Sequence, residues 1–131
     1  MRIVLDTNVL ISALGWQGNE YIIFQKCVRG ELTLIISAEI IEEFQRVIQY
    51  DRFKFIHDKA DDFVNLLFEI GELIQPEEHF FLVEDDPDDN IFLDAAFAGN
   101  AAYIISGDKH LLHLQKFKSV KILNAHDFLK E

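Results

Sequence analysis

Four acidic positions in this sequence are spaced so that a folded chain could gather them around one divalent metal ion. They are Asp6, Glu43, a member of the segment 86–89, and Asp108. Carboxylate oxygens are the ligands that Mg²⁺ and Mn²⁺ prefer, and these ions orient phosphate groups and activate bound water. Without a cation, each pair of carboxylates at about 4 Å would cost roughly 4 kcal/mol at an effective dielectric constant of about 20. A cluster of these residues therefore predicts a Mg²⁺ or Mn²⁺ site.

The elements that would position these acids alternate between apolar strands and amphipathic helices. Short apolar runs indicate strands, and apolar residues at helical spacing indicate helices. The predicted strands are 2–5, 32–36, 102–106 and 120–123, with a further strand at either 73–74 or 80–83. The predicted helices are 19–29, 37–48, 59–71, 87–98 and 109–114, followed by a terminal helix from Ala125 or His126. This alternation predicts an α/β fold with a parallel sheet covered on both faces.

Two of the acids come just after predicted strands. Asp6 follows the strand 2–5, and Asp108 follows the strand 102–106 after one glycine. Parallel sheets bind ligands in the crevice beyond the carboxyl ends of their strands. The segment 86–89 begins a helix whose amino end can face that edge, whereas Glu43 reaches it only if the helix 37–48 leans over it. The predicted topology thus brings the acids to one edge of the sheet.

Composition limits the kind of protein. A chain of 131 residues with 50% hydrophobic content predicts a single domain over residues 1–131, in which the lone Cys27 is buried. No leader pattern or apolar run of about 20 residues is present, so we expect a cytoplasmic protein without a membrane segment. The formal net charge of −11 is unusual for a nucleic-acid binder. An acidic chain can still act on RNA if metal ions or a basic partner supply positive charge.

Four short motifs in order resemble the PIN-domain ribonucleases, and in particular the VapC-like toxin components of toxin–antitoxin systems. The motifs are VLDTNV at 4–9, Ser37 with Glu43, DDPDDN at 85–90, and SGDK at 106–109. The resemblance spans nearly the whole chain. It implies a three-layer α/β/α sandwich and Mg²⁺- or Mn²⁺-dependent endonuclease cleavage of RNA that leaves a 3′-hydroxyl and a 5′-phosphate. It also implies frequent homodimers and inhibition by a small antitoxin protein.

The resemblance assigns the acids to roles in metal binding and catalysis. It makes Asp6 the central ligand, Glu43 the helix acid and Asp108 the fourth member. Counting back from the SGDK motif without gaps places the third acidic position on Asn90, with Asp89 just before it. Either Asp89 turns inward, or Asn90 ligates through its carbonyl oxygen or a water without adding charge. We favour Asp89, because hard dications prefer charged oxygen ligands.

Other polar residues near the motifs could support the site. Side chains that could orient the carboxylates, or replace one as a ligand, are those of Thr7, Asn8, Asp86, Asn90 and Ser106. Among the basic side chains available for phosphate contacts, including Arg52, we expect Arg46 and Lys109 to bind substrate.

Each acid also has an ordinary structural explanation. Asp6 and Asp108 could simply cap helices, Glu43 could be a solvated helix residue, and the helix dipole alone favours acids at 86–89. Two other functions therefore stay open. One is a PIN-like module that binds RNA or protein without cutting it. The other is a receiver-type phosphoacceptor domain, which would need paired acids where this chain has Asp6-Thr7-Asn8.

Overall fold

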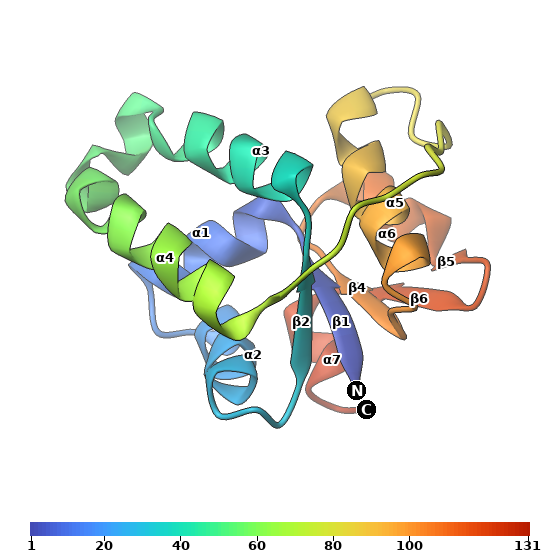
Figure 1. The fold of residues 1–131 in the computed structure, drawn as a ribbon, viewed down its shortest axis with the longest axis horizontal. Coiled ribbons are helices and arrows are strands. Elements are labelled where there is room, and N and C mark those ends of the chain that lie inside the picture. Colours follow the sequence, from blue (N-terminus) through green and yellow to red (C-terminus); the bar gives the residue numbers. More distant parts are fainter.

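A six-stranded sheet runs through the middle of the protein in the computed structural model, which describes residues 1–131 (Figure 1). The strands are β1 (Arg2–Leu5), β2 (Thr33–Ile36), β3 (Glu72–Leu73), β4 (Tyr103–Ile105), β5 (Lys116–Phe117) and β6 (Val120–Leu123). Their order is β3-β2-β1-β4-β6-β5. All neighbouring strands are parallel except β5, which pairs antiparallel with β6.

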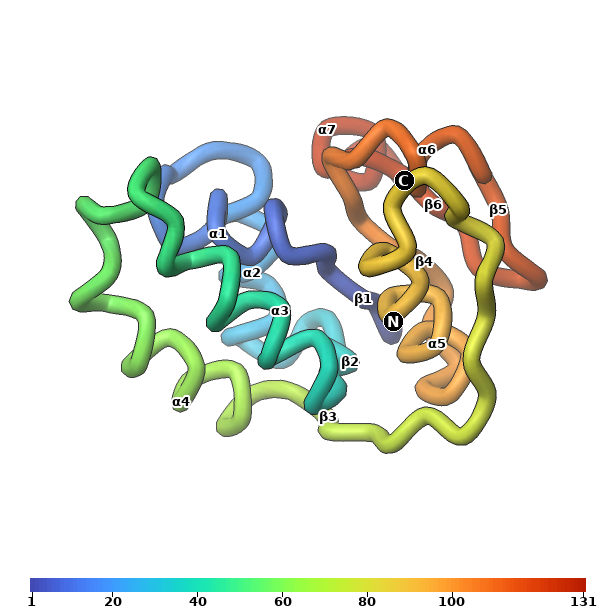
Figure 2. The backbone as a smooth tube through the Cα atoms, turned by 90° about the horizontal axis from the view of Figure 1, so that it is seen from above, coloured from blue at the N-terminus to red at the C-terminus, as the bar shows by residue number.

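Helices cover both faces of this sheet. They are α1 (Thr7–Gly15), α2 (Asn19–Val28), α3 (Ala38–Ile48), α4 (Ala60–Ile70), α5 (Asn90–Ala98), α6 (Lys109–Leu114) and α7 (Ala125–Phe128), with 3₁₀ segments η1 (Asp51–Lys59) and η2 (Pro87–Asp89). The helices α1 to α4 lie on one side of β1, and α5 and α6 lie on the other (Figures 1 and 2). The predicted three-layer α/β/α architecture is confirmed. None of the helices is both long and apolar enough to cross a membrane.

The strand order explains why the helices divide in this way. The chain steps outward from β1 to β2 to β3, and then returns across the sheet to β4 on the far side of β1. Crossovers between parallel strands are almost always right-handed, so outward and returning connections place their helices on opposite faces. The direction of the connections therefore changes between β1 and β4, and this leaves a crevice at their carboxyl ends.

The predicted elements agree with the structure except in four places. The middle strand is β3 at Glu72–Leu73, close to the first of the two predicted alternatives, while residues 80–83 form no strand. The helix α1, the 3₁₀ segment η1 and the edge strand β5 were not predicted. The segment η1 has few apolar residues at a helical period, and β5 pairs with β6 through only two residues. Pro87 begins the turn η2, and α5 follows it.

The core is built on strands that are apolar on both faces, as expected for a parallel sheet between helices. Ile3, Val4 and Ile104 have no exposed surface. On the α3 and α4 side, Phe63 lies between Phe24 and Phe44, with ring centroids 5.0 Å and 5.3 Å away. Cys27 is buried as predicted, and burial raises the pKa of its thiol to about 12.

Two polar side chains on α5 anchor the long connection that leads from β3 to the acidic segment. The Asn90 amide accepts from the backbone N–H of Val83 at 2.9 Å and donates to the carbonyls of Val83 and Pro87 at 3.0 Å and 3.1 Å. One turn later, Asp94 accepts from the Phe80 backbone N–H at 2.8 Å and contacts His79 at 3.0 Å. These bonds hold the connection against α5 just before η2 begins, and so position the acids of η2.

We expect Asn90→Ala to lower the free energy of unfolding by roughly 2–4 kcal/mol, because it leaves the buried polar groups of Val83 without partners. Urea unfolding followed by circular dichroism measures the change. The matched control is Gln75→Ala, an exposed position in the same connection, which should change stability by less than about 0.5 kcal/mol. Equal losses in the two variants would contradict an anchoring role for Asn90.

Candidate active site

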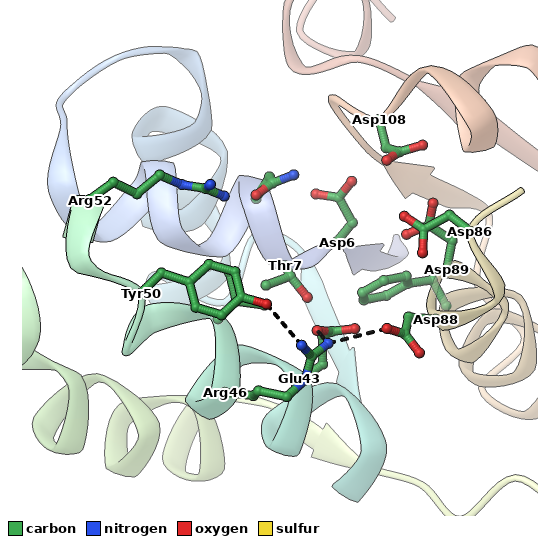
Figure 3. A pocket seen from close by; sticks show the side chains of 13 residues that line it. Asp6, Thr7, Glu43, Arg46, Tyr50, Arg52, Asp86, Asp88, Asp89 and Asp108 are labelled. Carbon is green, nitrogen blue, oxygen red and sulfur yellow. Dashed lines mark hydrogen bonds and ion pairs between the residues drawn. The ribbon is translucent and has the colours of Figure 1, made fainter.

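An open, polar pocket lies in the crevice at the carboxyl ends of β1 and β4, and its volume is about 280 Å³ (Figure 3). Six of the residues that line it are acids: Asp6, Glu43, Asp86, Asp88, Asp89 and Asp108. They come from four different parts of the chain. The pocket coincides with the point where the sheet's connections change direction, which is where α/β sheets bind their ligands.

Asp6 is fixed in place by the ends of both central strands. Its side chain is buried, and one oxygen accepts from the Val9 backbone N–H at 2.9 Å, which caps α1. The other oxygen accepts from the Ser106 hydroxyl, and that hydroxyl accepts in turn from the Asp108 backbone N–H at 2.9 Å. Burial raises the pKa of Asp6 to about 6, although these hydrogen bonds oppose the shift. The Ser106 hydroxyl thus links the Asp6 carboxylate to the start of the segment that carries Asp108.

Asp86, Asp89 and Asp108 form the tightest group of carboxylates in the pocket. Each offers an oxygen, and these three oxygens all lie within 4.8 Å of one another. One Asp108 oxygen accepts from the backbone N–H groups of His110 and Leu111 at 2.7 Å and 3.3 Å, which caps α6. Asp89 is buried, and its Oδ2 has no hydrogen-bond partner. Burial, followed by the nearby charge of Asp108, raises the pKa of Asp89 to about 8.

Glu43 faces the same pocket from the opposite wall. Its helix α3 begins at Ser37, whose hydroxyl accepts from the Ile40 backbone N–H at 3.2 Å. The Glu43 carboxylate pairs with Arg46, which also contacts Asp88 at 3.2 Å across the pocket. Burial raises the pKa of Glu43, and the positive charge of Arg46 opposes that shift. Glu43 therefore lines the pocket but lies outside the tight group of three aspartates.

The other predicted residues divide between the pocket and its surroundings. Thr7 and Asn8 line the pocket, and the Thr7 hydroxyl is buried without a partner. The side-chain amide of Asn90 is hydrogen-bonded to the backbone of Val83 and Pro87. Asp89 lines the pocket, and Asn90 does not. Lys109 lies outside, in a neighbouring pocket that also contains His110 and His113.

Two polar lining residues were not assigned to the site from the sequence. Tyr50 was missed, and Arg52 was only one of several basic residues without a location. The two stand on the wall opposite the aspartates (Figure 3). An aromatic and basic run, Tyr50-Asp51-Arg52-Phe53, directly after the helix that carries Glu43 was the available signal. Asp94, an acid inside an otherwise apolar helix, was a comparable signal for the anchor on α5.

Residues 2–110 match the PIN domain family. The chain belongs to this family. The PIN domain is 30% identical over 139 aligned positions to the uncharacterized protein MJ1680 of Methanocaldococcus jannaschii, covering 96% of this chain and 83% of that protein. The resemblance predicted from the four motifs is confirmed.

Solved structures share the fold of this PIN domain over nearly its whole length. One is the structure of VapBC2 from Rickettsia felis bound to a DNA fragment from its promoter. A chain of that structure superposes on this one with a TM-score of 0.65 and 14% identity, covering 95% of this chain and 98% of that one. A chain of VapBC-1 from nontypeable Haemophilus influenzae superposes with a TM-score of 0.63 and 16% identity, covering 96% and 99%. These similarities establish the fold.

We expect Asp89→Asn to stabilise the metal-free PIN domain at alkaline pH. The pKa of Asp89 is raised from 3.8 to about 8 in the folded chain, so the wild type loses stability as pH rises between these values. The amide carries no charge at any pH. We expect the free energy of unfolding of Asp89→Asn to exceed that of the wild type by on the order of 2–4 kcal/mol at about pH 8.5. This difference should disappear near pH 3, below both pKa values.

Urea unfolding in excess chelator across this pH range measures the difference. The matched control is Asp58→Asn on η1, where the aspartate is exposed, and its stability should follow the wild type at every pH. Parallel pH profiles for Asp89→Asn and the wild type would show that the Asp89 carboxyl carries no ionisation cost in the folded chain.

Proposed function

We propose that this PIN domain is a Mg²⁺- or Mn²⁺-dependent endoribonuclease and the toxin of a toxin–antitoxin pair. The observation that carries the proposal is the grouping of Asp86, Asp89 and Asp108 within 4.8 Å beside the buried Asp6. Carboxylates at such distances repel one another strongly in a partly buried site. A divalent cation removes this repulsion and makes the arrangement stable in its ionised form.

The donor set suits a hard cation. The pocket offers carboxylate, hydroxyl and amide oxygens and contains neither cysteine nor histidine, which argues for Mg²⁺ or Mn²⁺ over zinc. The buried, unpartnered Oδ2 of Asp89 fits a metal ligand. Asp6, Asp89 and Asp108 would hold the ion, and Glu43 would complete the acidic set from α3. Asp86 is a neighbouring alternative ligand.

Hydrolysis of a phosphodiester needs an oriented phosphate and an activated water, and both are what a bound Mg²⁺ or Mn²⁺ supplies. The protein contributes fixed positions. Ser106 and the backbone of Val9 hold Asp6, and the amino end of α6 holds Asp108. The Thr7 hydroxyl is buried at the pocket wall and has no hydrogen-bond partner within the chain, so it would be available to a group bound beside it. Arg46 brings positive charge to the pocket, which lowers the repulsion between the acids and an RNA backbone.

A small antitoxin and a second copy of the chain are the partners that we propose. The similar solved structures are VapBC assemblies, and the similarity covers nearly the whole of this chain. The net charge of −11 favours an antitoxin that carries basic residues. Such a partner would also offset the repulsion between an acidic protein and RNA.

A PIN domain that binds RNA or protein without cutting is the second candidate. The pairing of Glu43 with Arg46 favours it, since this pair engages one of the four predicted acids away from the aspartate group. Cleavage assays with metal and chelator separate the two functions.

We expect the purified protein to cleave single-stranded RNA in Mg²⁺ or Mn²⁺, to leave 3′-hydroxyl and 5′-phosphate ends, and to be inactive in excess chelator. Asp6→Asn keeps the cap of α1 but removes the central charge, and it should lower cleavage by roughly 100-fold or more. Gel analysis of a labelled oligoribonucleotide measures the rate, with Asp58→Asn as the matched control.

Two outcomes would overturn the proposed function. One is full cleavage by Asp6→Asn or in chelator, which would point to a contaminating nuclease. The other is tight RNA binding with Mn²⁺ and no cleavage, which would favour the binding module.

A further inference from the structure

The wall opposite the aspartates presents an aromatic ring and a guanidinium group side by side. Tyr50 precedes η1, and its side chain is among the exposed large groups of the surface, with 41% of the residue accessible. The Arg52 guanidinium carbon lies 5.4 Å from the centroid of the Tyr50 ring and 4.8 Å from that of Phe53. Both Tyr50 and Arg52 line the acidic pocket (Figure 3).

Arg52 differs from the other arginine of this pocket. Arg46 pairs with Glu43 and Asp88, whereas Arg52 makes no ion pair despite the surrounding acids. Its positive charge rests over aromatic rings, where the interaction is favourable but leaves the N–H donors available. Arg52 is therefore the pocket cation that is free to bind an incoming anion.

Tyr50 is held so that its ring is ready to receive a planar group. Its hydroxyl accepts from Arg46 at 2.9 Å, which orients the ring. Its backbone carbonyl accepts from the Phe53 N–H at 2.9 Å and lies 3.2 Å from the His57 ring nitrogen, which fixes the start of η1. An ordered, exposed aromatic ring loses little conformational freedom when a base stacks on it.

We propose that Tyr50 and Arg52 form a nucleotide subsite beside the scissile phosphate. An unpaired RNA base stacks on the Tyr50–Arg52 pair, and the phosphate next to that base accepts hydrogen bonds from Arg52. This inference rests on the proposed ribonuclease function and gives a physical reason for its single-stranded substrate, because a base held in a duplex cannot reach the ring. Stacking on aromatic rings and on arginine is the usual way in which proteins bind unpaired bases.

The first test removes each group of the subsite. We expect Tyr50→Ala to raise the Kd and the KM for a single-stranded oligoribonucleotide by roughly 5- to 100-fold, the range for one lost base stack. Tyr50→Phe keeps the ring and loses only the bond to Arg46, so it should stay within about 3-fold of the wild type. Arg52→Gln should raise both constants and weaken their dependence on salt.

The matched control for charge is Arg29→Gln, an exposed arginine at the end of α2 that pairs with Glu31. We expect it to leave both constants unchanged. Anisotropy of a labelled oligoribonucleotide with Mn²⁺, read before cleavage proceeds, gives the Kd. Thermal unfolding of each variant separates loss of the subsite from loss of the fold.

A second test identifies the stacked base. In a series of oligoribonucleotides that each lack one base, a single position should abolish the effect of Tyr50→Ala, because the ring then has nothing to bind. An effect of Tyr50→Ala that is the same on every oligonucleotide would overturn the subsite, as would a Kd equal to that of the wild type. Failure of the proposed ribonuclease function can be told apart from failure of the subsite. RNA binding that depends on Tyr50, without any cleavage, would contradict the ribonuclease function and support the subsite.

Discussion

The bond between the buried Asp6 carboxylate and the Ser106 hydroxyl joins the ends of the two central strands at the point where the sheet's connections change direction. The same Asp6 carboxylate caps α1 by accepting from the Val9 N–H, and the same Ser106 hydroxyl accepts from the Asp108 N–H. The positions of the pocket acids Asp6 and Asp108 are thus fixed by the backbone at the ends of β1 and β4. A change in the separation of these strands would move Asp6 and Asp108 relative to each other, so the geometry of the site depends on the packing of the sheet.

Crowded negative charge is the second constraint on this structure. Burial and mutual repulsion raise the pKa values of Asp6 and Asp89 and oppose the ionised form of the site. The fold supplies only partial compensation: helix caps for two aspartates, and Arg46 for the outer acids. Arg52 does not neutralise any of these acids, because its guanidinium group lies over the rings of Tyr50 and Phe53. A protein with a net charge of −11 can therefore still present a free cation to an anionic chain at the edge of its most acidic pocket.

The α5 helix shows how a site residue and a structural residue can stand next to each other. Asn90 occupies the position at which the motif comparison expects an acid, yet its amide satisfies the backbone groups of Val83. Asp89, one residue earlier, lines the pocket. Neighbouring residues on a helix point in directions about 100° apart, so two buried side chains one position apart face different surroundings. The buried Asp94 adds a second anchor one turn further on.

Most of the alternation of strands and helices could be predicted from the sequence, because apolar runs and helix caps are local signals; α1 was the one long helix that was missed. Ser37 begins α3 and Asp108 begins α6 as predicted, and the α/β fold and family followed from motif order. Asp6 and Asp108 could be placed at one edge because the carboxyl ends of parallel strands coincide. The folded structure was needed to show which of Asp89 and Asn90 lines the pocket, that Asp86 joins the tight group, and that Glu43 pairs with Arg46. It also brought Tyr50 and Arg52 to the pocket. These outcomes depend on side-chain directions and on contacts between segments far apart in the chain, which no local pattern encodes.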